Sequence, residues 1–243
     1  MINGIIITAR LSSSRLPGKV LLKCGKQTMI EYLISRLNIS KFNNKIVVAI
    51  DEEKSDDKLE KFLKSKKINY FRGSSNNVTK RVIDAATFFK FENITLITGD
   101  CPLIDYQLLD QCIRVFYLNK CDFVTNCNFR SYPDGMDVQI FKLKSLKKIY
   151  KGIKNDLEKE HVTLGLRNNL KTIRTINLIA PKKLFWPSLG LTLDEKKDYI
   201  LIKKIVKHFK NRIDYNCLDI LNYLNNNKEL IKINSNVKRK GDS

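Results

Sequence analysis

Short apolar runs that alternate with amphipathic segments constrain the fold of this chain more than any other feature. Residues 4–9, Gly-Ile-Ile-Ile-Thr-Ala, form an unbroken β-branched run, which is typical of a strand buried on both faces of a parallel sheet. Further strand-like runs lie at residues 45–50, 68–71, 94–98 and 122–125, with helical patterns between them. Strands and helices in this order predict an α/β fold in which a mostly parallel sheet lies between two layers of helices.

Two of the predicted helices carry start signals. Thr28 and Glu31 precede an apolar stripe with the spacing of a capping box. Ser55 is followed by two acidic residues that suit the positive end of a helix, so we expect Ser55 to cap the second helix. Both helices are therefore predicted to begin within a residue of these positions.

The alternation changes after Asp137. A strand is expected at residues 137–141, followed by two helical stretches separated near Asn155 and by a strand around residues 172–178. We interpret residues 137–180 as a small inserted arm or subdomain that serves dimerisation or acceptor binding.

The last part of the chain returns to the earlier pattern. Strand character is expected at residues 191–193, and helices are expected at residues 195–209 and 218–225. A chain of 243 residues suits one α/β domain better than two. We therefore predict a single domain over residues 1–233 and a basic, frayed tail over residues 234–243.

The formal net charge of +20 raises the possibility of a nucleic-acid-binding module. The lysines are scattered over nearly every predicted helix, however, and no basic patch is interleaved with aromatic residues. We therefore favour a generally basic surface that attracts small anionic substrates, and we expect no nucleic-acid partner. The nucleic-acid-binding module remains an alternative.

The cysteines and the apolar runs bear on the compartment. None of the six cysteines forms a CxxC pair or has a histidine at metal-ligand spacing, so we expect reduced thiols. No run approaches the roughly 20 apolar residues of a membrane helix, and the chain enters an apolar strand without a basic leader. These features predict a cytoplasmic enzyme without a membrane partner.

The loop after the first strand is the strongest candidate for a binding site. It reads Ala-Arg-Leu-Ser-Ser-Ser-Arg-Leu-Pro-Gly-Lys over residues 9–19. Small residues let backbone amides approach an anion, and Arg10, Arg15 and Lys19 can neutralise triphosphate oxygens. Because the GxxxxGK[ST] spacing is absent, a Walker-type ATPase is disfavoured.

This loop resembles that of the cytidylyltransferases that activate acidic sugars, the acylneuraminate and Kdo type, and most closely the branch of spore coat polysaccharide biosynthesis protein F. Leu11 and Ser12 stand where that branch has Met and Gly. The resemblance extends in the same order from Ile5 to about Val206. It implies a Rossmann-like three-layer α/β/α nucleotide-diphospho-sugar transferase fold.

Two acidic segments are candidates for a metal site. Asp100 follows a predicted strand in Thr-Gly-Asp-Cys-Pro-Leu-Ile-Asp, and a carboxylate there suits Mg²⁺, although Asp100 is also an ordinary turn residue. Asp194 lies in Leu-Thr-Leu-Asp-Glu-Lys-Lys-Asp, where a metal ligand and a helix cap are equally consistent with the residues. The resemblance favours a metal role for both, with Mg²⁺ as the cofactor. Asp105 is interpreted as a helix cap.

Further site residues follow from the resemblance. Arg72 is expected to contact the nucleotide base, Gly73 gives the base room, and Arg81 either assists or faces solvent. The expected nucleotide contacts are Ala9, Arg10, Leu11, Ser12, Ser13, Lys19, Arg72, Gly73, Arg81 and Gly99. The expected acceptor contacts are Tyr132, Asp134, Asp137 and His161. Asp134 is also part of an ordinary turn signal, and His161 suits a structural hydrogen bond equally well.

The activity implied by the resemblance is transfer of CMP from CTP to a sugar hydroxyl, with release of pyrophosphate. The expected acceptor is a nonulosonic or other keto-sugar acid used for a cell-surface polysaccharide or glycan. Arg10, Arg15, Lys19 and Asp100 are the expected catalytic residues, and a homodimer is expected. The alternative enzyme is a GT-A glycosyltransferase with a nucleotide-sugar donor, which normally carries an Asp-x-Asp motif that is absent around Asp100.

Overall fold

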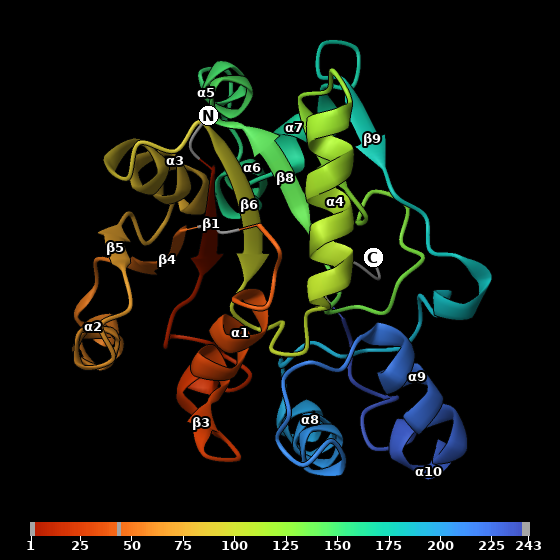
Figure 1. Ribbon diagram of the computed structural model, residues 1–243. Coiled ribbons are helices and arrows are strands. Elements are labelled where there is room, and N and C mark those ends of the chain that lie inside the picture. Colours follow the sequence, from red (N-terminus) through yellow and green to blue (C-terminus); the bar gives the residue numbers. More distant parts are fainter. Residues whose placement is uncertain (1–2, 43–44, 240–243) are drawn as a thin grey trace.

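The computed structural model describes residues 3–42 and 45–239, and these residues build one seven-stranded sheet in the order β5-β4-β1-β6-β8-β7-β9 (Figure 1). The strands are β1 (Asn3–Thr8), β4 (Lys45–Asp51), β5 (Tyr70–Gly73), β6 (Asn93–Thr98), β7 (Phe123–Thr125), β8 (Gln139–Lys142) and β9 (Thr175–Asn177). Strand β8 runs antiparallel to β6 and β7, and the other neighbouring strands pair in parallel. The predicted mostly parallel sheet is therefore confirmed.

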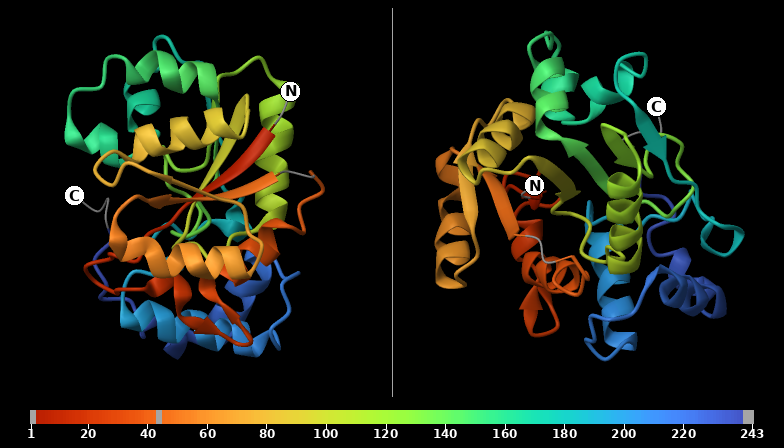
Figure 2. Two further views of the ribbon diagram at one scale, coloured as in Figure 1. Left: turned by 90° about the vertical axis from the view of Figure 1, so that its left-hand side faces the viewer. Right: turned by 45° about the horizontal axis from the view of Figure 1, so that its top comes forward.

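Helices cover both faces of this sheet. The helices are α1 (Met29–Leu37), α2 (Asp57–Ser65), α3 (Val78–Phe88), α4 (Tyr106–Leu118), α5 (Leu143–Tyr150), α6 (Asp156–Glu160), α7 (Leu164–Asn168), α8 (Lys196–His208), α9 (Cys217–Asn226) and α10 (Lys228–Ile231). Successive side chains of β1 point to opposite faces: Ile5 and Ile7 join the core with α1 and α4, whereas Ile6 joins the core with α3 and α5. Figure 2 shows the resulting three layers, with α3 and α5 on one side of the sheet and α1 and α8 on the other.

The first predicted helix start is confirmed and the second is wrong. The Thr28 amide donates to the Glu31 carboxylate at 2.7 Å, which completes a capping box with the short ribbon of β2 (Lys23–Cys24) and β3 (Gln27–Thr28) just before it. Ser55 does not cap α2, because a 3₁₀ turn (Lys54–Asp56) intervenes. The Asp56 carboxylate accepts instead from the Leu11 and Asp51 amides, so it fastens the loop after β1 to the end of β4.

Residues 137–180, expected as a small inserted arm or subdomain, contribute two strands to the central sheet, and their expected role in dimerisation or acceptor binding stays a prediction. Strand β8 inserts between β6 and β7, and its adjacent residues Ile140 and Phe141 are buried in the two opposite cores. Strand β9 extends the same sheet beyond β7. These residues belong to the sheet because both faces of β8 are apolar, which a free arm would expose to water.

The strand expected at residues 191–193 is also absent from the described residues. The Leu191 amide donates to the Asp134 carbonyl at 2.7 Å, and the Leu193 amide donates to the Asp100 carbonyl at 2.8 Å. Because its two amides bond to different segments, this stretch forms no ladder. It joins the segment of Asp134 to the segment of Asp100 instead.

The predicted frayed tail is wrong for residues 234–239, and residues 240–243 lie outside the described residues. The Asn234 amide group is buried and donates to the Gly190 carbonyl at 2.9 Å and to the Asp198 carboxylate at 2.8 Å. Arg239 donates to the same carboxylate at 2.7 Å. Residues 234 and 239 are thus held by the buried carboxylate of Asp198, four residues beyond Asp194.

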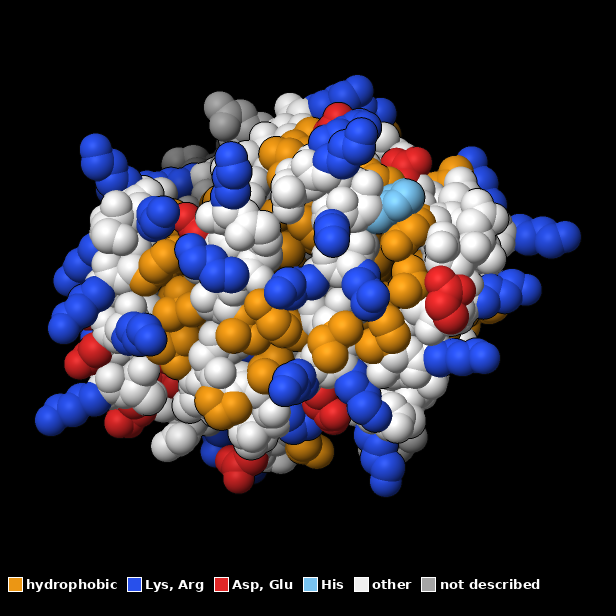
Figure 3. Space-filling model, turned by 90° about the horizontal axis from the view of Figure 1, so that it is seen from below, with side chains coloured by type: hydrophobic (Ala, Val, Ile, Leu, Met, Phe, Trp, Pro, Cys, Tyr) orange, Lys and Arg blue, Asp and Glu red, His pale blue; other side chains and the backbone are white. Residues whose placement is uncertain are grey.

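The basic residues of the surface do not gather on the face formed by α1, α2, α8 and α9. Figure 3 shows Lys and Arg side chains distributed over this face, with apolar and uncharged side chains between them. None of the helices in residues 3–42 and 45–239 is both long and apolar enough to cross a membrane.

Candidate active site

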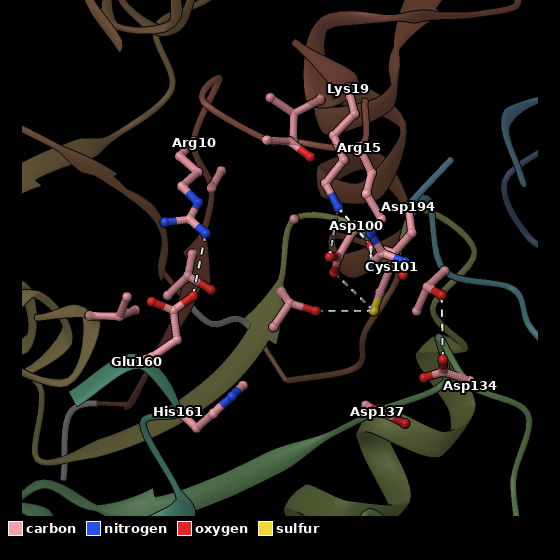
Figure 4. Close-up of a pocket in the computed structure, with 18 of the residues that line it drawn as sticks. Arg10, Arg15, Lys19, Asp100, Cys101, Asp134, Asp137, Glu160, His161 and Asp194 are labelled. Atoms are coloured by element: carbon pink, nitrogen blue, oxygen red, sulfur yellow. Dashed lines mark hydrogen bonds and ion pairs between the residues drawn. The ribbon is translucent and has the colours of Figure 1, made fainter. Parts of the chain in front are cut away.

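A cavity of about 340 Å³ opens where β1 and β6 end, which is where ligands bind in open parallel sheets. The loop after β1 supplies Ala9, Arg10, Ser13, Ser14, Arg15 and Lys19, the turn after β6 supplies Gly99, Asp100 and Cys101, and more distant segments supply Arg81, Arg130, Asp134, Asp137, Glu160, His161, Thr192 and Asp194. Figure 4 shows the labelled side chains converging from these elements. The structure therefore brings together most of the residues predicted from the sequence.

Gly18 closes the loop after β1. Its backbone lies in the left-handed region at φ 70°, and its amide donates to the Leu11 carbonyl at 2.9 Å. A 3₁₀ turn (Lys19–Leu21) follows and sets the base of the Lys19 side chain. Leu11 packs against the core and Ser12 faces solvent, so neither residue lines the cavity, and the predicted nucleotide contacts of both stay untested.

Lys19 lies at the centre of the cavity, between two carboxylates. Its ammonium nitrogen is 2.9 Å from Asp100 Oδ2 and 3.1 Å from Asp194 Oδ1, and Arg15 reaches Asp194 at 3.0 Å. Burial alone would lower the pKa of the Lys19 ammonium, but the attraction of both carboxylates outweighs burial and raises that pKa. Burial likewise opposes ionisation of Asp100, yet Lys19 and Thr98 hold the pKa of Asp100 below its ordinary value.

The backbone around Asp100 requires glycine at the preceding position. The Gly99 amide donates to the Thr8 carbonyl at 2.8 Å, and a Cβ at Gly99 would lie 3.0 Å from that oxygen and 3.1 Å from the Ala9 Cβ. Since the Leu193 amide also bonds to the Asp100 carbonyl, the two acidic segments are joined through the backbone. The glycine lets the turn after β6 approach the loop after β1 closely.

The carboxylates of Asp100 and Asp194 suit Mg²⁺ as donors. Oxygen atoms from both already converge on one cation, the Lys19 ammonium. The described residues contain no group of three or more His, Cys, Asp or Glu side chains arranged to hold a metal. Proteins usually hold Mg²⁺ with one or two carboxylates, and substrate phosphates and water complete the coordination of the ion.

Arg81 enters the cavity from α3, whereas Arg72 does not reach it. Arg72 is committed to Asp57 at 2.8 Å, to Glu60 at 2.6 Å and to backbone carbonyls at the end of β4. The structure therefore does not bring Arg72 into the cavity, because its donors are satisfied outside it, and its predicted base contact stays untested. Gly73 does not line the cavity either. A Cβ at Gly73 would lie 3.1 Å from Arg81 Cγ, so this glycine makes room for Arg81 rather than for a base.

The Arg81 side chain has hydrogen-bond donors that the described residues leave without an acceptor. Only 2% of the residue is exposed, and its Nε and Nη1 atoms have no hydrogen-bond partner among the described residues. Burial lowers the pKa of its guanidinium. A buried donor without a partner costs about 1–3 kcal/mol, so Arg81 is suited to an acceptor that a ligand brings into the cavity.

The predicted acceptor residues occupy the opposite wall, with one exception. Arg130 binds both oxygens of Asp137 at 3.1 Å and Asp134 at 3.1 Å. Burial, with a contribution from Asp137, raises the pKa of Asp134 to about 6. Tyr132 is buried in the core and lines neither cavity, so the structure does not place it beside the other predicted acceptor residues.

Sequence reasoning missed several residues of the site. Arg10 pairs with Glu160 at 3.3 Å, and Arg239 lies 3.8 Å from Asp194. A second cavity of about 1020 Å³ shares Arg130, Asp134, Asp137 and His161 with the first and is also lined by Asn128, Gln139, Arg167 and Trp186. The Glu-Lys-Glu-His segment at residues 158–161 was the available signal for Glu160. Gln139 on β8 and Arg167 on α7 lie on regular elements but carry no motif, and Asn128, Trp186 and Arg239 lie in irregular stretches.

All six cysteines are free thiols, as expected from their spacing. Cys101 lines the first cavity beside Asp100. Burial raises the pKa of its thiol well above the ordinary value, so it remains protonated and unreactive.

Together, the fold and the site define a nucleotidyltransferase. A parallel sheet places a cation-rich loop opposite a pair of carboxylates, and this arrangement is suited to binding a nucleoside triphosphate with a divalent ion. The remaining question is to which family of such enzymes the chain belongs.

The comparisons with known proteins answer it. The cytidylyltransferase family model matches residues 4–234, and the chain belongs to this family. It is 32% identical over 228 residues to spore coat polysaccharide biosynthesis protein SpsF of Bacillus subtilis, covering 92% of this chain and 94% of that one. It is 31% identical over 137 residues to a 3-deoxy-manno-octulosonate cytidylyltransferase of Francisella tularensis subsp. holarctica, covering 55% and 53%.

A solved structure supports the same assignment. The cytidylyltransferase from Leptospira borgpetersenii serovar Hardjo-bovis has a TM-score of 0.90 to this chain at 33% identity, with 99% of both chains covered. Family membership decides between the two enzyme classes that the sequence left open, in favour of nucleotidyl transfer over glycosyl transfer. The resemblance derived from the loop after β1 is thereby confirmed.

Proposed function

We propose that the protein transfers CMP from CTP to a hydroxyl group of a sugar acid, with release of pyrophosphate, in the synthesis of a surface polysaccharide or glycan. The observation that carries the proposal is the convergence of Asp100 and Asp194 on the Lys19 ammonium at the end of β1 and β6. Family membership supports CTP as the nucleotide. The named activity of the Francisella relative and the named role of the Bacillus relative support the acceptor class and the pathway.

In this mechanism the chain positions two reactants and compensates charge. Arg10, Arg15 and Lys19 hold the β- and γ-phosphates and balance the negative charge that develops on the leaving pyrophosphate. The acceptor oxygen forms a bond to the α-phosphorus while the bond from that phosphorus to the β-phosphate oxygen breaks. Holding both partners in line supplies much of the rate enhancement.

Asp100 and Asp194 are the residues that would hold Mg²⁺. The ion would supply positive charge that compensates the phosphates of the nucleotide. Lys19 bridges both carboxylates, so its ammonium would be available to phosphate oxygens if these carboxylates held the ion. Asp134 borders both cavities and is the carboxylate placed to take the proton of the acceptor hydroxyl. The expected homodimer and the expected cytoplasmic location stay predictions.

The proposal is tested by pyrophosphate release from each of the four nucleoside triphosphates with Mg²⁺ and a panel of 2-keto-sugar acids. We expect release from CTP, loss of release with EDTA, and a fall of about 100-fold or more in kcat for Asp100→Asn and Asp194→Asn. Asp156→Asn, a substitution at an exposed carboxylate on α6, is the matched control and should leave kcat unchanged. Full activity in Asp100→Asn would exclude the metal assignment.

A further inference from the structure

The second cavity has no residue-level role in the function proposed above, and the inference drawn from it rests on that function. It adjoins the nucleotide cavity through Arg130, Asp134, Asp137 and His161. Its other walls come from the loop after β7, from α7, from residues 186–190 and from the C-terminal segment. A molecule bound there would reach the nucleotide cavity across the shared wall.

The cationic residues of this second cavity differ in their pairing. Arg130 is matched by Asp134 and Asp137, and Arg239 is matched by Asp198 at 2.7 Å. Arg167 has no carboxylate within 4.0 Å in the part of the chain that the structure describes. Among the described residues, its positive charge therefore has no paired carboxylate.

Arg167 also carries an unused donor. Its Nε atom is buried and has no hydrogen-bond partner among the described residues. A buried donor on a charged group is costly unless a partner satisfies it. Within residues 3–42 and 45–239, the Arg167 guanidinium therefore has no paired carboxylate, and its buried Nε has no acceptor.

The position of Arg167 is set by a tightly packed helix. Gly165, on the same short helix α7, lies so close to α5 that an added Cβ would come within 2.8 Å of the Ile149 side chain. The neighbouring Leu166 is fully buried in the core. The base of the Arg167 side chain is thus fixed, and the entropy lost when the side chain binds a ligand is reduced.

Two further side chains of the cavity suit the body of a sugar. Asn128 Oδ1 is buried without a partner, so it can accept a hydrogen bond from a hydroxyl group. Trp186, the single tryptophan of the chain, offers an aromatic surface to the apolar face of a sugar ring. Both residues line the same cavity as Arg167.

We propose that Arg167 binds an anionic group of the acceptor, a carboxylate or a phosphate, while Asn128 and Trp186 hold the sugar body. The planar guanidinium fork matches either group through paired hydrogen bonds. The second cavity therefore selects anionic acceptors and directs their hydroxyl group toward the nucleotide cavity. Acceptor binding weakens when the negative charge is removed from the acceptor or when the Arg167 guanidinium is removed from the enzyme. CTP binding stays unchanged in both cases.

The binding step is measured through the fluorescence of Trp186, which needs no turnover. The full-length protein is titrated with 3-deoxy-manno-octulosonate, with its uncharged methyl ester, with glucose 1-phosphate and with inorganic phosphate. We expect the acid or the sugar phosphate to change the fluorescence and the ester to bind about 10- to 100-fold more weakly. The comparison of acid with sugar phosphate identifies the anionic group.

Variants assign the effect to Arg167. Arg167→Met should weaken anion binding about 10- to 100-fold, and Arg167→Lys should restore part of it because the charge returns without the fork. Arg174→Met is the matched control, because Arg174 is exposed, pairs only with Asp122 and lies outside both cavities. With an acceptor that turns over, Arg167→Met should raise the KM for the acceptor and leave the KM for CTP unchanged.

The outcomes separate this proposal from the proposed function. Anion binding that depends on Arg167, without pyrophosphate release from CTP, would support the anion site and contradict the transfer reaction. Equal binding of acid and ester, unchanged binding in Arg167→Met, or no response to any of the anionic probes would overturn the anion site whatever the activity.

Discussion

The carboxyl group of Asp134 should make the folded protein less stable at neutral pH than at acidic pH. Its pKa is raised from 3.8 to about 6, chiefly by burial and then by Asp137. A difference of this size corresponds to about 3 kcal/mol between the protonated and ionised forms. Because the folded state binds this proton more tightly than the unfolded state, the contribution is present below about pH 4 and is lost as the pH rises through about 6.

Asp134→Asn removes the loss of stability that ionisation of the Asp134 carboxyl causes as the pH rises. The amide keeps an oxygen for Thr192 and leaves Arg130 paired with Asp137. We expect the free energy of unfolding to rise by about 1–3 kcal/mol at about pH 8 and to change little at about pH 4. In a chain of this size the melting temperature would rise by about 2–4 °C for each kcal/mol. Activity should fall at the same time, because the variant can no longer accept a proton.

The assay is urea denaturation of wild type and Asp134→Asn at about pH 4 and about pH 8, with far-UV circular dichroism as the signal. Asp156→Asn is the control: Lys159 lowers the pKa of Asp156, so this substitution should have a small effect of the opposite sign. A stability difference between wild type and Asp134→Asn that is independent of pH, or that is larger in acid, would refute the reasoning.

Three further predictions concern other parts of the site. Lys19→Met leaves Asp100 and Asp194 without their shared cation, so Mg²⁺ should raise the melting temperature of this variant more than that of wild type; an equal rise would contradict the carboxylate pair as the metal site. Arg81→Met should raise the KM for CTP about 10-fold or more, whereas Arg72→Met should not, and the reverse order in steady-state kinetics would restore the sequence-based assignment. Gly135→Ala should cost more than 1 kcal/mol in urea denaturation, because φ is 105° and the Cβ would lie 2.7 Å from the backbone of Leu191; Gly152→Ala, which meets only an ordinary contact at 3.6 Å, should be nearly neutral.

Signals that lie within a few residues predicted local structure well. The capping box at Thr28 needed only Glu31, and the buried run of β1 needed only its own β-branched residues. Ser55 was a poor prediction because it lies in a 3₁₀ turn, and the adjacent Asp56 carboxylate bonds to the distant Leu11 amide, a partner that no local pattern reveals. The cap of α1 was therefore predictable from local sequence, and the start of α2 was not.

The site was predictable where a residue directly follows a strand. Arg10 and Asp100 lie just beyond the ends of β1 and β6, and a parallel sheet places those ends together. Arg72 lies at the end of β5, another strand of the same sheet, but Asp57 and Glu60 on α2 bind its guanidinium outside the cavity. The order of elements in the sequence determines which residues lie at the edge of the sheet. It does not determine which neighbouring side chains bind the charged groups of these residues.

The C-terminal segment shows the same limit over a longer distance. A lysine- and asparagine-rich end is normally disordered, since it buries little apolar surface. Here Asp198 is almost fully buried and accepts from both Asn234 and Arg239, which fastens the chain end beside Asp194. The hydrogen bonds to one buried carboxylate hold this segment in place despite its polar composition. The partners of that carboxylate can be found only from the fold.

The most direct test of the account is whether an acceptor sugar acid triggers pyrophosphate release from CTP. The protein is incubated with CTP and Mg²⁺ with and without each acid, pyrophosphate is measured, and the product is weighed by mass spectrometry. We expect release that depends on the acceptor, a product whose mass equals that of the acid joined to CMP, and loss of both in Asp194→Asn. Release without an acceptor, or no CMP-linked product from any acid, would contradict it.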